Sequence, residues 1–138
     1  MNLPNRLKIK WEKKFGKRKY GNTWKEIDVE WYKKIHDSNH ILHDDFKKFL
    51  KSKKDIETVL EVGCGSGIYP INNKELFKNL EYTGVDFSKS VIAYCKNNSN
   101  FEFFDGDFIK MEASKKYDCV FSHAVVDHVY DIEIFITN

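Results

Sequence analysis

The sequence is short of the features that define several classes of protein. Its 138 residues include three cysteines and two prolines, and no apolar run approaches the roughly 18–20 residues that cross a bilayer. The first residues lack the apolar stretch of a secretory signal. Cys64, Cys95 and Cys119 show no CxxC spacing and lie on or beside apolar segments, which indicates reduced thiols. We therefore expect neither a membrane protein nor a disulfide framework, but a cytoplasmic protein.

Charge is present in quantity and is unevenly distributed. Hydrophobic residues make up 41% and charged residues 32%, a composition typical of a globular chain. Residues 1–54 hold 16 Lys and Arg against 7 Asp and Glu, whereas residues 55–138 hold 7 against 14. The basic segment is either a solvated helix face or a surface that attracts an anionic substrate or nucleic acid. We divide the chain at this change, into a helical cap (1–54) and a second segment (55–138).

The periodicity of apolar residues changes at the same place. Helical spacing over 24–35 and 40–53 gives way to short apolar runs at 58–62, 82–85, 101–104 and 119–122, which predict buried strands. Helical segments are expected between them over 73–78 and 88–98, with Ser88 as N-cap. Pro70 predicts that the helix after the first strand is short, irregular or delayed. This order predicts an α/β fold with a parallel sheet.

Polar residues follow each predicted strand. Glu61 precedes a glycine-rich loop, and Asp86 ends the second strand. Asp105 and Asp107 follow the third strand, and Ser122 lies at the end of the fourth. Parallel strands end on one edge of a sheet, where ligands of open α/β folds bind. Asp86 lies where an acidic residue reaches ribose hydroxyls in dinucleotide-binding folds. Position 68 is Ile, so the third glycine of the nicotinamide-cofactor fingerprint is absent, which opposes an oxidoreductase.

Four motifs in order resemble those of the class I S-adenosylmethionine-dependent methyltransferases. They are Glu-Val-Gly-Cys-Gly-Ser-Gly (61–67), Tyr-Thr-Gly-Val-Asp-Phe-Ser (82–88), Phe-Asp-Gly-Asp-Phe (104–108) and the segment 117–129. The resemblance implies a Rossmann-like sheet of order 3-2-1-4 flanked by helices, and methyl transfer from S-adenosylmethionine to a small-molecule acceptor, with S-adenosylhomocysteine as product.

The resemblance also implies a role for each motif residue. Glu61 would face the methionine amino end of the cofactor, and Asp86 would hold the ribose hydroxyls, although an N-terminal helix cap is the alternative for Asp86. Asp107 would accept from the adenine amino group, while either Asp107 or Asp105 builds the turn. The remaining cofactor residues would be Gly63, Cys64, Gly65, Phe87, Phe108 and Ser122.

Histidines offer the candidate catalytic and metal-binding groups. His123 lies just past the fourth strand and could take a proton from an acceptor atom, so it is the predicted catalytic residue. His128 is expected to be a packing residue at a helix start. His36, His40 and His43 could share a helix face, but no obvious carboxylate or cysteine completes a metal set, and we expect no metal.

The chain departs from the family pattern in two ways. The family fold looks seven-stranded, whereas the fourth strand here ends near residue 122, leaving room for one helix over 129–136. We expect an incomplete methyltransferase fold that self-associates, as a homodimer, through the exposed fourth strand or the C-terminal helix. The alternative function is a non-catalytic cofactor-binding or assembly module. The fourth motif also lacks the Asp/Asn-Pro-Pro-Tyr pattern, so a nucleic-acid acceptor is possible but not favoured.

Overall fold

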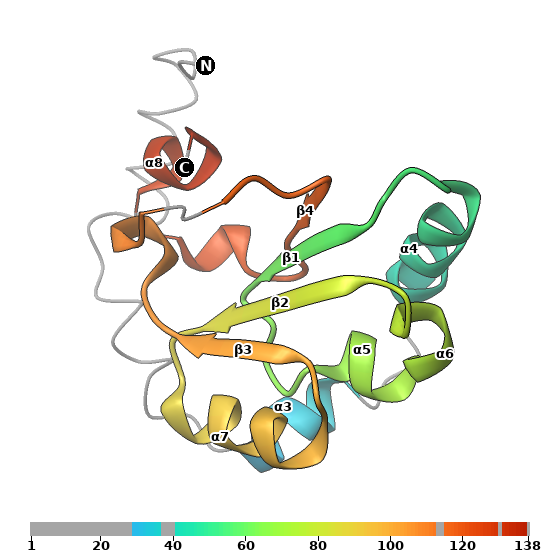
Figure 1. Ribbon diagram of the computed structural model, residues 1–138. Helices are drawn as coiled ribbons and strands as arrows, with labels where there is room; N and C mark the ends of the chain where they lie inside the picture. Colours follow the sequence, from blue (N-terminus) through green and yellow to red (C-terminus); the bar gives the residue numbers. More distant parts are fainter. Residues whose placement is uncertain (1–28, 37–40, 113–114, 130, 138) are drawn as a thin grey trace.

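The computed structural model describes residues 29–36, 41–112, 115–129 and 131–137, and its centre is a four-stranded parallel sheet (Figure 1). The strands are β1 (Thr58–Val62), β2 (Glu81–Asp86), β3 (Glu102–Asp105) and β4 (Cys119–Phe121). Their order is β3-β2-β1-β4, with Leu60 of β1 opposite Thr83 of β2 and Val120 of β4. This is the predicted Rossmann-like arrangement, in which β1 lies inside the sheet and its carboxyl end faces the site.

One face of the sheet carries the larger core. Val59, Tyr82 and Phe103 point to this face and pack with residues of α3 (Val29–His36), α4 (Ile41–Ser52), α5 (Ile68–Asn72), α6 (Lys74–Phe77) and α7 (Lys89–Asn98). Alternation along each strand sends Leu60 and Val85 to the other face. That face is covered by the 3-10 helix η1 (Phe108–Lys110) and by α8 (Ile132–Thr137). No described helix has the length and apolarity to traverse a bilayer.

The structure confirms the order of elements and refines several bounds. Ser88 caps α7 by accepting a hydrogen bond from the Val91 amide at 3.4 Å. The helix after the glycine loop is short, as predicted, but it begins at Ile68 rather than near Asn73, and α6 follows it separately. Pro70 lies in the first turn of α5. Backbone amides there have no acceptor within the helix, so a proline without an N–H removes no helical hydrogen bond. The helix expected over 129–136 appears as α8 and begins later, at Ile132, while the 3-10 helix η2 (Val126–His128) precedes the expected range.

Two expectations for the N-terminal segment fall partly outside the described residues. The helices predicted over 24–35 and 40–53 appear as α3 and α4. Residues 1–28, which include the start of the helix predicted over 24–35, and residue His40 lie outside the description.

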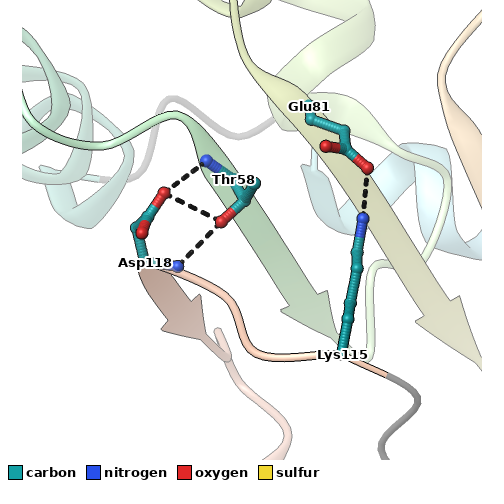
Figure 2. Close-up of polar contacts among 4 residues, drawn as sticks. All are labelled: Thr58, Glu81, Lys115 and Asp118. Carbon is teal, nitrogen blue, oxygen red and sulfur yellow. Dashed lines mark hydrogen bonds and ion pairs between the residues drawn. The ribbon is translucent and has the colours of Figure 1, made fainter.

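A clamp joins the first residues of β1 and β4 (Figure 2). Asp118 Oδ2 accepts from the backbone amide of Thr58 at 2.8 Å, from its hydroxyl at 2.8 Å and from the Glu57 amide at 3.0 Å. The Asp118 amide donates to the Thr58 hydroxyl oxygen at 2.9 Å. These backbone contacts lower the pKa of the Asp118 carboxyl. Lys115 forms a separate ion pair with Glu81 at the start of β2. The clamp fixes where β4 enters the sheet, and therefore where the residues after it reach the site.

Candidate functional site

A cavity of about 170 Å³ lies beyond the carboxyl ends of the strands. Its wall combines the tips of β1, β2 and β3 with η1, the segment after β4 and two helices, α3 and α8. Six residues predicted from the sequence line it: Gly63, Asp86, Phe87, Asp107, Phe108 and His123. The strand ends therefore deliver most of the predicted site to one place. The volume is that of part of a small-molecule site, and aromatic rings form much of its wall.

The glycine-rich loop after β1 is held from behind by β2. The amides of Gly63 and Cys64 donate to the Val85 carbonyl at 2.7 and 3.0 Å. Gly63 has a φ of +76°, and a Cβ there would lie 2.2 Å from Val125 Cγ2. A side chain at position 63 is thus excluded by both backbone conformation and space. Cys64 and Gly65, which follow Gly63 in the loop, are buried and do not line the cavity.

Asp86 ties the loop to the end of β2. Its Oδ2 accepts from the Gly65 amide at 2.9 Å, and its Oδ1 accepts from the Ser88 amide at 2.9 Å. The Tyr32 hydroxyl is a longer contact of Oδ1, at 3.5 Å. Burial raises the pKa of the Asp86 carboxyl, while these hydrogen bonds act in the opposite direction. Asp86 therefore orders the turn before α7, whose N-cap is Ser88 rather than Asp86, and also lines the cavity.

Glu61 has different surroundings, although it ends the neighbouring strand. Its side chain is buried on the face of Val59, away from the cavity wall, and Oε2 accepts a hydrogen bond from the Tyr82 hydroxyl. Burial raises the pKa of Glu61 to about 8, with the charge of Asp86 adding to the effect. Glu61 is therefore protonated near neutral pH and lies behind the glycine loop.

The third strand contributes Asp107 rather than Asp105. Asp105 is exposed, whereas Asp107 lines the cavity beside Phe108. Asp107 Oδ1 also caps η1 by accepting from the Ile109 amide at 3.2 Å, and Oδ2 pairs with Lys110 at 3.3 Å. One carboxylate thus orders the loop after β3 and faces the cavity.

The segment after β4 brings His123 to the cavity wall. Its Nδ1 lies 3.2 Å from the Tyr69 hydroxyl of α5. The next residue, Ala124, has a φ of +55°, a left-handed conformation that is unusual for a residue with a side chain. This turn places Val125 against Gly63 and lets His128 join the wall. Ser122 is half-buried and does not line the cavity.

Several wall residues were not predicted as site residues. Trp31 and Tyr32 come from α3, and Phe135 comes from α8. The available signal was the helical spacing of aromatic residues in the predicted cap segment, which fits either a lid over the site or plain core. Helical spacing alone does not distinguish those two, because both bury the same apolar face. The side chain of His36 and all of His40 lie outside the description, so the three-histidine pattern stays a sequence observation.

Comparison with known proteins agrees with this geometry. A family model described as a methyltransferase domain matches residues 53–138. The malonyl-[acyl-carrier protein] O-methyltransferase of Bacillus anthracis is 30% identical over 83 residues, covering 58% of this chain and 31% of that protein. The probable (S)-tetrahydroprotoberberine N-methyltransferase 2 of Papaver bracteatum is 30% identical over 89 residues, covering 60% and 25%. The chain thus spans about a third or less of these curated relatives' length.

Solved structures share the fold. The plantazolicin methyltransferase BamL, crystallised with a triazolic desmethylPZN analog and SAH, aligns with a TM-score of 0.76 at 23% identity, covering 95% of this chain and 54% of that one. CalS10, an amino pentose methyltransferase from Micromonospora echinaspora crystallised with SAM, aligns with a TM-score of 0.53 at 16% identity, covering 74% and 48%. At these identities the likeness shows the fold. With the family model matching more than half of its residues, this chain belongs to the methyltransferase domain family.

Proposed function

We propose that this chain binds S-adenosylmethionine and takes part in methyl transfer to a small-molecule acceptor. The observation that carries the proposal is the convergence of the glycine loop, Asp86 and Asp107 on one aromatic-lined cavity at the strand ends. Matched solved structures contain SAM or SAH, and the curated relatives are named as O- or N-methyltransferases. Those names support methylation and leave the acceptor atom open.

The residues present fit the proposed cofactor. Asp86 lines the cavity, and a ribose hydroxyl would replace the long Tyr32 contact at Oδ1 while the Gly65 and Ser88 amides hold the carboxyl group in place. Phe87, Phe108 and the Asp107 carboxylate would surround the adenine. The backbone of Gly63, Cys64 and Gly65 would follow the methionine and ribose, with Glu61 beneath this loop. S-adenosylmethionine would supply an activated methyl group, and the protein's part is to align it and exclude water. Ser122 and His123 would lie at the methyl end.

Calorimetry with S-adenosylhomocysteine tests this proposal. We expect Asp86→Asn to weaken binding by about tenfold or more, because a charged acceptor of hydroxyl hydrogen bonds is lost. Asp105→Asn is the matched control, since Asp105 ends the adjacent strand but is exposed and does not line the cavity. Absence of binding heat with both S-adenosylhomocysteine and S-adenosylmethionine would reject the proposal.

Turnover is a claim separate from binding. The chain spans about half the length of the solved neighbours it matches. If the cofactor binds and no acceptor is methylated, the alternative of a non-catalytic cofactor-binding module is favoured. A methyl-transfer assay using labelled S-adenosylmethionine separates the two outcomes.

We further propose three properties of the whole protein. Residues 1–54 act as a cap over the site, supported by Trp31 and Tyr32 in the cavity wall. The protein self-associates as a homodimer through the β4 edge or α8, supported by the exposure of Val120 and Ile136. It works in the cytoplasm, supported by three cysteines that are all free thiols.

A further inference from the structure

Helix α3 brings a phenol to the carboxyl group at the end of β2. The Tyr32 hydroxyl lies 3.5 Å from Asp86 Oδ1, and both residues line the cavity. Tyr32 is 8% exposed and packs in the larger core cluster, so its ring is held in place. The contact between hydroxyl and carboxyl group therefore lies where the core meets the wall of the candidate cofactor site.

The hydroxyl of Tyr32 is the donor in this contact. Burial raises the pKa of that hydroxyl, and the charge of Asp86 adds to the effect, so the phenol keeps its proton. Burial also raises the pKa of the Asp86 carboxyl, and the hydrogen bond from Tyr32 opposes that effect. Tyr32 thus supplies a hydroxyl donor to a carboxyl group that is largely shielded from water.

The other donors to Asp86 belong to the backbone. The Gly65 amide donates to Oδ2 and the Ser88 amide donates to Oδ1, each at 2.9 Å. These two bonds are part of the glycine loop and of the turn before α7, so a ligand does not displace them while the loop keeps its shape. The Tyr32 contact is longer and comes from a side-chain hydroxyl. A hydroxyl group of a ligand can replace this donor with one of the same kind.

We propose that the Tyr32 hydroxyl holds the place that a ribose hydroxyl takes at Asp86 when the cofactor binds, so that α3 gates entry of the cofactor; the inference rests on the proposed function. A carboxylate oxygen has two lone pairs, and the Ser88 amide and the Tyr32 hydroxyl take up those of Oδ1. A ribose hydroxyl reaches this oxygen only as the phenol leaves. The affinity for the cofactor is therefore lowered by the cost of releasing Tyr32.

The contacts of α3 explain why this release concerns the helix. Lys33 Nζ lies 4.5 Å from the centre of the Tyr94 ring, which ties α3 to α7, its neighbour in Figure 1. Trp31 packs edge-on against Tyr32, with ring centroids 5.5 Å apart, and lines the cavity as well. The helix is thus attached to α7 on one side and to Asp86 through Tyr32 on the other. Breaking the second attachment frees the part of α3 that forms the cavity wall.

Calorimetry with S-adenosylhomocysteine distinguishes a competing hydroxyl from a supporting one. Tyr32→Phe keeps the ring and removes the hydroxyl, and we expect it to bind about threefold more tightly than the wild type, the effect of one long hydrogen bond. Tyr94→Phe is the matched control, because Tyr94 also contacts α3 but lies outside the cavity wall, and its affinity should equal that of the wild type. Weaker or unchanged binding by Tyr32→Phe would overturn the inference.

Two nucleosides place the competition at the ribose hydroxyls. Adenosine carries both hydroxyls, whereas dideoxyadenosine lacks both and has nothing to donate to Asp86. We expect Tyr32→Phe to bind adenosine more tightly than the wild type does and to bind dideoxyadenosine equally well. Equal gains for the two nucleosides would mean that Tyr32 obstructs the cavity by its bulk, and would contradict the inference.

The contact can also be measured without a ligand. In protein labelled with ¹³C-aspartate, we expect the pKa of the Asp86 carboxyl to rise in Tyr32→Phe, because a donor that favours the ionised form is lost. Tyr94→Phe should leave this pKa unchanged, and an unchanged value in Tyr32→Phe as well would overturn the inference. Failure of all three proteins to bind S-adenosylhomocysteine contradicts the proposed function instead, and leaves the result of the titration standing.

Discussion

Glu61 and Asp86 show how strongly the surroundings of one carboxyl group decide its chemistry. They end adjacent strands, and both are buried. Two backbone amides donate to Asp86, whereas the hydrogen bond given to the Glu61 carboxyl comes from the Tyr82 hydroxyl. Backbone donors favour the ionised form, while burial favours the neutral form. Burial thus raises the pKa of both carboxyl groups, but the backbone amides counter that effect at Asp86, which faces the cavity, whereas Glu61, with a pKa of about 8, is a neutral acid behind the loop.

The protonation of Glu61 predicts a distinctive dependence of stability on pH. Its pKa rises from an ordinary 4.5 to about 8 on folding, so between these values the folded state holds a proton that the unfolded state has lost. The stabilisation is complete below pH 4.5 and is lost as pH rises to about 8, with a slope near 1.4 kcal/mol per pH unit. Glu61→Gln keeps an acceptor for Tyr82 without the titration.

Urea unfolding of the wild type and of Glu61→Gln across pH 5–9 measures how the free energy of unfolding depends on pH. We expect the variant to gain stability relative to the wild type as pH rises, and the difference to level off above about pH 8. Comparing the two curves removes the contributions of other titrating groups. A difference independent of pH would mean that Glu61 is ionised in the folded protein.

At the scale of secondary-structure elements, local patterns such as the alternation of side chains along a strand explain what could be predicted from the sequence. The strand ends, the Ser88 cap and the placing of Asp86 beside the glycine loop depend on local patterns and motif spacing, and all were predictable. The direction of Glu61 was also accessible, because side chains alternate along β1 and Val59 and Glu61 therefore share the core face. The start of α5 was missed because Pro70 was weighed against a helix, although the first turn accepts proline.

The wall residues from α3 and α8 could not be predicted in the same way. Trp31, Tyr32 and Phe135 reach the cavity through packing between segments far apart in the sequence. Periodicity identifies an apolar helix face but not the element that the face meets. The Tyr69–His123 contact, 54 residues apart, has the same origin.

The hydrogen bonds of Asp118 make the attachment of β4 to β1 depend on a single carboxylate. Asp118→Asn should lower the melting temperature at pH 7, because one charged oxygen accepts all three hydrogen bonds from Glu57 and Thr58. The pKa of Asp118 is depressed on folding, so its stabilisation is present above the ordinary pKa of about 4 and is lost as pH falls through the folded value. The difference between variant and wild type should therefore shrink on acidification.

Thermal unfolding at pH 7 and near pH 3 checks the clamp. Lys115→Ala is the control, since it removes the neighbouring ion pair with Glu81 without touching the clamp (Figure 2). Exposed ion pairs contribute little to stability, so Lys115→Ala should change the melting temperature less than Asp118→Asn. Equal losses in the two variants would show that the clamp has no special role.

The whole molecule is asymmetric about its sheet. The α3–α7 face is covered by five helices, whereas the face of Leu60 and Val85 has η1 and α8 among the described residues. Val120 of β4 is 56% exposed on that second face, and Phe104 of β3 is 46% exposed at the opposite edge. Apolar side chains on an edge strand beside unpaired backbone groups favour pairing with another chain.

Self-association through β4 can be tested with one matched pair of variants. We expect the wild type to sediment as a mixture of monomer and dimer, with the dimer fraction rising with concentration. Val120→Lys should shift the protein towards monomer, because a charge on the β4 edge opposes strand pairing. Phe104→Lys adds the same charge on β3, at the other edge of the sheet, and should leave the dimer fraction unchanged. A monomer at every concentration would contradict self-association, and an equal response of both variants would place the contact away from β4, with α8 as the remaining candidate.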